Sequence, residues 1–161
     1  MSTELQTQEN NYPAQLTNFE KGLVTFLENH NLPTTGIFVG VEERLRVFSN
    51  VDYVIKQLDP EMTTKSVYLA KFLAASASGL FDASLNYLWD ETILQLRKRV
   101  AQFDLEYFYD NTVGGDKRKS FRSEEDLVKL PDSDLINGAK EIELISDVGH
   151  RHLVHINYMR N

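Results

Sequence analysis

Apolar residues recur every three or four positions through most of this chain, which is the spacing of an amphipathic helix. One such stripe predicts a helix over residues 14–30, and a second predicts a helix over 41–58. Proline disfavours helix in the residue before it, so the first helix is expected to end near Asn31-Leu32-Pro33. Asp59-Pro60-Glu61 then indicates a turn that leads into a new helix with proline in its first turn.

The stretch from Thr63 to Arg99 predicts one long central helix. Its only breaker is Gly79, and a single glycine costs a helix only about 1 kcal/mol, so the helix can continue through it. A break near Gly79 is the alternative. A run of small side chains over 74–79 predicts that another helix crosses closely at this point.

The rest of the chain reads as shorter helices and connectors. An aromatic-rich segment over 103–109 leads to a loop signal at 111–115, and 116–122 is a basic connector. Ser123 precedes acidic residues that suit the first turn of a short helix. Only 36–41 resembles a strand, so we predict an all-α fold: a helical bundle with one long central helix and a C-terminal amphipathic helix.

The last predicted helix runs from Asp134 to Asn161, and two glycines lie on its apolar face. Glycine is unfavourable inside a helix, so we expect it to admit a second helix or a second subunit, which suggests a homodimer through the terminal helix. Arg160 falls on the same face and therefore needs a carboxylate, a backbone carbonyl or a phosphate, unless the helix end frays and the side chain reaches water. The residues of this face are Leu135, Gly138, Ile142, Ile145, Gly149, Leu153, Ile156 and Arg160.

Length and composition place the chain among globular proteins. Its 161 residues, 42% of them hydrophobic and 25% charged, predict a single helical domain over 13–161 that follows a polar, disordered segment at 1–12. The terminal helix stops without a glycine, proline or polar tail, so we expect the domain to be truncated at its C-terminal end or closed by a partner. The absence of cysteine excludes disulfides and thiolate metal sites. The chain also lacks an apolar run long enough for a membrane helix and an N-terminal targeting signal, and we expect no membrane association and a cytoplasmic location.

The net charge of −7 argues against general nucleic-acid binding, yet residues 95–122 hold seven basic and four acidic side chains. Lys117, Arg118, Lys119 and Arg122 follow the aromatic segment 103–109, so together they are a candidate RNA contact. The alternative is that the basic residues form a solvated surface and the aromatic residues fill a core.

Three of the four histidines, His150, His152 and His155, lie near the end of the chain. On a helix His150 points away from the other two, so at most two imidazoles share one side, and we expect no metal site. No glycine-rich phosphate loop or Gly-x-Ser-x-Gly elbow occurs either, and we expect no cofactor, including a small-molecule one.

With Arg160-Asn161 at the end of its last helix, the chain resembles the HEPN superfamily of helical domains, which are often dimeric and occur in toxins and anti-phage systems. The family signature is an arginine, often followed by a polar residue such as asparagine, with a histidine four to six residues after the arginine. The resemblance covers roughly residues 40–161. One part of the resemblance is the pattern of residues that precede the arginine: Ile145, Gly149, Leu153, His155, Ile156 and Met159. The other part is the stretch 79–109, with Leu88-Trp89-Asp90-Glu91-Thr92 and Tyr107-Phe108-Tyr109.

The resemblance implies an RNA-targeting defence or toxin protein in which two protomers cleave RNA without a metal ion. In such a site a histidine moves protons and the arginine stabilises charge on the phosphate. Arg160 is then the catalytic residue and Asn161 its polar neighbour. The signature histidine is absent from this sequence, so the chain as given is expected to be inactive, and enzymatic activity depends on a histidine supplied by a longer chain.

Two other hypotheses remain open. The chain could be a non-catalytic helical interaction or dimerisation module of a larger protein, as the glycine-containing face suggests. It could also be a ligand-binding bundle with a pocket lined by Trp89 and the tyrosines.

Overall fold

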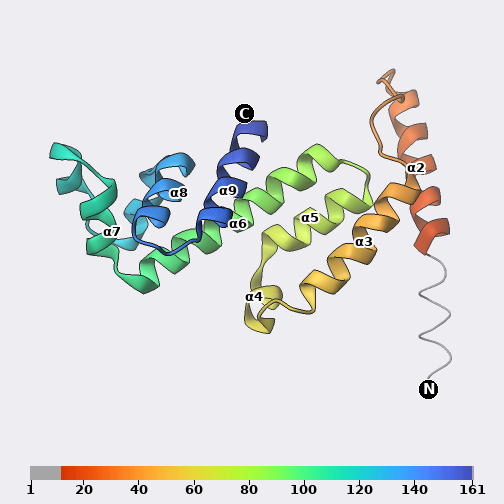
Figure 1. Cartoon of the computed structure of the whole chain (residues 1–161). Helices are drawn as coiled ribbons and strands as arrows, with labels where there is room; N and C mark the ends of the chain where they lie inside the picture. Colours follow the sequence, from red (N-terminus) through yellow and green to blue (C-terminus); the bar gives the residue numbers. More distant parts are fainter. Residues whose placement is uncertain (1–11, 161) are drawn as a thin grey trace. The chain divides into compact units, whose positions relative to one another are not determined.

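The computed structural model describes residues 12–160, which fold into helices joined by turns and short loops, with no strand in that range (Figure 1). The predicted all-α class is confirmed, with a long helix of 23 residues and a separate C-terminal helix. Residues 1–11 of the predicted disordered segment lie outside the described residues, as does Asn161. The helices are α2 (Tyr12–Asn29), α3 (Val41–Ile55), α4 (Pro60–Lys65), α5 (Val67–Ala77), α6 (Phe81–Phe103), α7 (Leu105–Thr112), the 3₁₀ helices η1 (Gly115–Ser120) and η2 (Glu124–Lys129), α8 (Asp132–Glu141) and α9 (Asp147–Arg160).

The chain packs as two compact units, and the division falls between Leu88 and Trp89 inside α6. The first unit contains α2 to α5 and the beginning of α6, and the second contains the rest of the chain. The sequence-based division into one domain over 13–161 stays a prediction.

The predicted long helix over 63–99 is interrupted twice. Ser66 ends α4 and caps α5, because its hydroxyl accepts a hydrogen bond from the Leu69 N–H at 3.0 Å. The second break, at 78–80, is the alternative that Gly79 suggested. The start of α4 agrees with the sequence: Asp59 caps it by accepting a hydrogen bond from the Glu61 N–H, and Pro60 is its first residue.

Gly79 allows the chain to turn sharply between α5 and α6. Its φ is +75°, a left-handed conformation that side chains disfavour. A Cβ at this position would lie 2.8 Å from Nε of Arg44 and 3.0 Å from the Val39 N. The small-residue run therefore does allow a close approach, but the group that approaches Gly79 is an arginine side chain.

That arginine, Arg44 on α3, is completely buried in the first unit. Its Nε donates to the Val39 carbonyl at 2.6 Å, and Nη1 donates to the Ala77 carbonyl at 3.3 Å. Nη2 forms an ion pair with the Glu20 carboxylate on α2. A buried guanidinium is tolerated only when its donors are satisfied, so Arg44 joins α2, the loop before α3 and the end of α5.

The close contact between Gly79 and Arg44 predicts different effects of alanine at two similar glycines. Gly36 also has a positive φ, +73°, but nothing lies within 4 Å of the position of its Cβ. Gly36→Ala should cost about 1–2 kcal/mol of unfolding free energy from backbone strain alone. Gly79→Ala should cost about 2–4 kcal/mol, because it adds a clash with Arg44. Urea unfolding followed by circular dichroism measures both, and equal losses would contradict the packing at Gly79.

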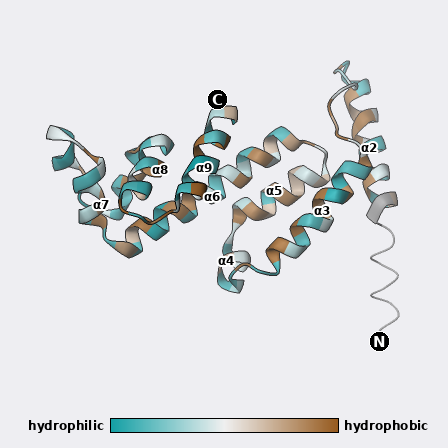
Figure 2. Cartoon of the chain, in the orientation of Figure 1, coloured by the Kyte–Doolittle hydropathy of each residue, from teal (hydrophilic) through white to brown (hydrophobic). Residues whose placement is uncertain are grey.

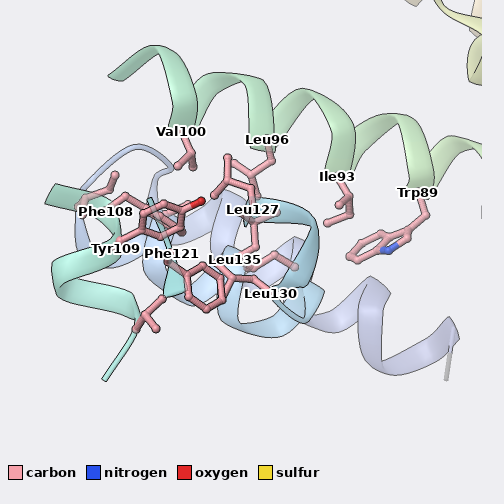
Figure 3. Packing of buried hydrophobic residues seen from close by; sticks show 14 residues of the cluster. Trp89, Ile93, Leu96, Val100, Phe108, Tyr109, Phe121, Leu127, Leu130 and Leu135 are labelled. Atoms are coloured by element: carbon pink, nitrogen blue, oxygen red, sulfur yellow. The ribbon is translucent and has the colours of Figure 1, made fainter. Parts of the chain in front are cut away.

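The core of the second unit is formed by one side of α6 and the helices that follow. Figure 3 shows Trp89, Ile93, Leu96 and Val100 projecting from the same side of α6, as their helical spacing requires. Phe108 and Tyr109 of α7 face them, and both are almost completely buried. The other buried members of the cluster are Val113, Phe121, Leu127, Leu130, Leu135, Ile136, Ala139 and Ile142.

The prediction of one continuous terminal helix over 134–161 is wrong. The chain forms two helices, α8 and α9, which contact each other and are separated by a turn over 142–146. Glu143 in this turn has a φ of 60°. Ser146 begins α9, since its hydroxyl accepts a hydrogen bond from the Gly149 N–H at 3.1 Å. The predicted apolar stripe therefore does not exist as a single face.

Helix packing requires a glycine at position 138, as its place on the predicted apolar face suggested. A Cβ there would lie 2.1 Å from Oγ1 of Thr112 and 2.8 Å from a ring carbon of Phe108, so α8 lies directly against α7. Gly149, the other glycine, meets only the Ser146 hydroxyl at 3.4 Å. Gly138 thus serves a contact inside the chain, and it no longer indicates a second subunit.

Alanine substitution should also affect stability differently at Gly138 and Gly149. We expect Gly138→Ala to lower the unfolding free energy by about 1–3 kcal/mol, because Thr112 and Phe108 must move. Gly149→Ala should be neutral or stabilising by up to about 1 kcal/mol, because alanine favours helix. Thermal unfolding of the two variants beside the wild type tests this, and a stabilising Gly138→Ala would contradict the contact with α7.

Candidate functional site on the terminal helix

Arg160 is the last residue of α9, and its side chain turns inward onto the second unit. Its guanidinium carbon lies 5.1 Å from the centre of the Trp89 ring, within the range of a cation–π contact. Its Nη2 lies 3.6 Å from Oδ2 of Asp132, and the side chain is 30% exposed. A carboxylate, one of the partners that the sequence allowed, is found here, and Trp89 was not foreseen.

The carboxylate of Asp132 contacts three side chains. Besides Arg160, Oδ2 accepts a hydrogen bond from the indole N–H of Trp89 at 2.8 Å, and Oδ1 lies 3.4 Å from Nη2 of Arg97. Asp132 is the first residue of α8, where a negative charge is favoured by the helix dipole. The cluster of Asp132, Trp89, Arg97 and Arg160 therefore joins α6, the start of α8 and the end of α9.

Sequence reasoning missed Asp132 and Arg97 in this cluster. The available signal was an acidic residue after Pro131 at a helix start, which usually indicates only a favourable first turn. Trp89 was assigned to a ligand pocket in one hypothesis, but it is 3% exposed and its ring packs in the core.

The two sides of α9 differ sharply in exposure. Its inward side faces the rest of the unit: Leu153 packs against the core cluster, and Nε2 of His150 lies 2.8 Å from Oδ1 of Asn137 on α8. Its other side, which we call the outward face, is exposed throughout and mixes apolar with basic residues; Figure 2 shows the hydrophobic and hydrophilic positions that alternate along this helix. The outward face consists of Val148, Arg151, His152, Val154, His155, Ile156, Tyr158 and Met159.

Within residues 12–160, no group of three or more histidine, aspartate or glutamate side chains is placed to hold a metal ion. His152 and His155 are exposed on the outward face, whereas His150 contacts Asn137. His150 therefore lies on a different side of α9 from His152 and His155, as the helical spacing predicted.

The basic connector lies largely in η1, and its four basic residues have different environments. Arg118 is held in place: Nε donates to Asp110 Oδ1 at 2.6 Å, Nη1 donates to the Phe121 carbonyl at 2.7 Å, and the guanidinium lies 5.7 Å from the Tyr109 ring centre. Nε of Arg122 donates to the carbonyl of Lys119, and the Lys119 ammonium pairs with Asp116 on the surface. Lys117 is exposed.

The aromatic residues beside this connector divide into core and surface. Phe108 and Tyr109 are buried, while Phe103 and Tyr107 are 57% and 50% exposed. The Tyr109 hydroxyl donates to the Ser123 carbonyl at 2.9 Å, and burial, with the nearby Asp126 carboxylate, raises its pKa to about 12. An RNA contact by the connector stays a prediction. The exposed side chains available for it are those of Phe103, Tyr107, Lys117, Lys119 and Arg122.

The carboxylate of Asp126 fixes the chain next to the connector. It accepts hydrogen bonds from the N–H groups of Arg122 at 2.7 Å and Ser123 at 2.9 Å, and it pairs with Lys129. These donors favour the charged form and hold the pKa of Asp126 well below its ordinary value of 3.8.

This shift predicts a specific acid sensitivity. A carboxyl group with a depressed folded-state pKa stabilises the fold above its unfolded-state pKa, and the stabilisation is lost as the pH falls below that value. We expect the stability difference between the wild type and Asp126→Asn to be largest near pH 6 and to shrink as the pH falls below about 4. Urea titrations of both proteins at several pH values measure it, and a difference independent of pH would contradict the assignment.

No protein-family model, curated protein or solved structure matches this chain. Fold and site define the class: an all-α chain of two helical units whose terminal helix is anchored by one side and exposed on the other. None of the helices within residues 12–160 is long and apolar enough to cross a membrane.

Proposed function

We propose that this chain is a non-catalytic helical interaction module that binds a helix of another protein on the outward face of α9. The observation that carries the proposal is the exposure of five apolar side chains on a helix whose opposite side is firmly attached. Val148 is 52% exposed, Ile156 44% and Met159 64%. Val154 and Tyr158 are 43% and 81% exposed.

The anchoring of α9 supports this proposal. Arg160 is held by Asp132 and Trp89, His150 contacts Asn137, and Leu153 packs on the core. A helix attached at its beginning, middle and end presents its other face in a defined orientation. Such preorganisation lowers the entropy lost when a partner binds.

The proposal predicts that an amphipathic helix binds specifically at α9. The probes are soluble helical peptides of one length with the same apolar stripe, flanked by acidic, neutral or basic residues. Backbone amide signals of α9 in an NMR titration of the chain should shift with at least one peptide. If none of the peptides shifts them, the proposed function is lost.

A matched pair of variants locates the binding. Ile156→Asp combined with Met159→Asp should abolish the shifts, because it places charge at the centre of the apolar contact. Val128→Asp, at a residue of η2 that is 68% exposed, adds an acidic group elsewhere in the second unit and should leave the binding unchanged.

The second candidate function is a HEPN-like ribonuclease in which Arg160 contacts the phosphate. One observation favours it: the Arg160–Asp132 pair is long at 3.6 Å, and the arginine is 30% exposed, so the guanidinium could also reach an external phosphate. Asp132 weighs against it, because its negative charge repels a phosphate at this position.

Incubation of the chain with single-stranded RNA in the presence of a metal chelator tests the ribonuclease. Intact RNA agrees with the interaction module and also with a HEPN-like chain that lacks the signature histidine. Cleavage that is lost in Arg160→Ala but kept in Lys21→Ala, a change at an exposed lysine of α2, would instead establish the nuclease, because both variants remove one basic side chain and only the first removes the proposed catalytic residue.

A further inference from the structure

This inference rests on the proposed function and concerns the chemistry of the partner. The outward face of α9 carries one arginine, Arg151, and two histidines, His152 and His155, among its apolar residues. No aspartate or glutamate occurs between Val148 and Arg160, although the chain as a whole has 24 acidic residues and a net charge of −7. The basic character of this face is therefore opposite to that of the molecule.

The neighbouring charges do not neutralise this face. Asp147, in the first turn of α9, pairs with Nζ of Lys140 at 2.6 Å, and this pairing lowers the pKa of its carboxyl group. The charge of Arg160 lies on the inward side, at Asp132. Arg151 thus remains an exposed cation on the outward face, between Val148 and Val154.

The spacing of the residues suits a helical partner. Val148, His152, His155 and Met159 follow one another at intervals of four, three and four residues, which aligns them along one line of the helix. This line covers eleven residue steps, or about 17 Å. It offers an apolar residue at each end and two imidazoles in the middle, so a partner helix lying along it meets both kinds of group.

We infer that the partner is an acidic amphipathic helix, with an apolar stripe flanked by aspartate or glutamate. Its apolar residues would cover Val148, Ile156 and Met159. Its carboxylates would pair with Arg151, whose planar guanidinium binds carboxylates with two parallel hydrogen bonds, and would accept hydrogen bonds from the imidazole N–H groups.

Other occupants fit these groups less well. In a symmetric dimer through α9 a second copy of the chain would bring the same basic face, so Arg151 would find no carboxylate on it. A nucleic acid would satisfy Arg151 but would leave Val148, Ile156 and Met159 without apolar cover. Charge complementarity therefore favours the acidic helix.

The three peptides of the preceding section test this inference when their dissociation constants are measured by isothermal titration calorimetry. We expect the acidic peptide to bind at least about tenfold more tightly than the neutral one and the basic peptide to bind most weakly. Arg151→Glu should weaken the acidic peptide about tenfold and strengthen the basic one. Lys117→Glu makes the same change of charge on η1 and should leave both dissociation constants unchanged. Circular dichroism of each variant confirms that the helices are intact.

The outcomes separate the two proposals. If the neutral or basic peptide binds α9 as tightly as the acidic one, the acidic partner is ruled out while the interaction module stands. If no peptide binds, both fail. Light scattering after size exclusion and binding to anionic phospholipid vesicles are measured with the same samples. A dimer that Met159→Asp dissociates, or vesicle binding through α9 that is tighter than peptide binding, would overturn the inference.

Discussion

The carboxylate of Asp132 is the polar group that links the helices of the second unit. It receives the indole N–H of Trp89, and the guanidinium groups of Arg97 and Arg160 lie within 3.6 Å of it. Trp89 and Arg97 belong to α6, Asp132 to α8 and Arg160 to α9, so one acidic group connects three helices. The buried indole of Trp89 and two arginine side chains therefore share one carboxylate. This contact holds the end of α9, while His150 and Leu153 hold the rest of the helix, and together they orient the outward face.

The first unit contains a comparable arrangement with the charges reversed. There the cation, Arg44, is the shared group, and the Val39 and Ala77 carbonyls and the Glu20 carboxylate surround it. Gly79 is needed beside it, because any side chain would occupy the space of the guanidinium. In both units, then, a polar group from one helix is satisfied by groups from elements distant in sequence, and the apolar packing is arranged around it.

Much of the fold could be predicted from the sequence, because local signals define it. Pro60 and its cap Asp59 begin α4, Gly79 ends the turn after α5, and Ser123 with Asp126 forms the capping box of η2. The break between α8 and α9 had only one such signal, Ser146, whose hydroxyl caps α9. Residues 142–146 contain no glycine or proline, and the left-handed residue is Glu143, a residue type that rarely adopts this conformation. The hydrophobic spacing continued through the turn, so the stripe was read as one helix.

The candidate site was harder to predict from the sequence, because the role of each charged side chain depends on which groups it contacts in the fold. Arg118 was grouped with Lys117 as an RNA contact, yet it is tied to Asp110 and the Phe121 carbonyl, whereas Lys117 is exposed. For Arg160 the helical projection predicted a position on the apolar face with Leu153, and the structure adds that Asp132 is its carboxylate partner. What remains on the outward face is Arg151 with two imidazoles and five apolar side chains, and in the proposed interaction module that combination, rather than the terminal arginine, contacts the partner.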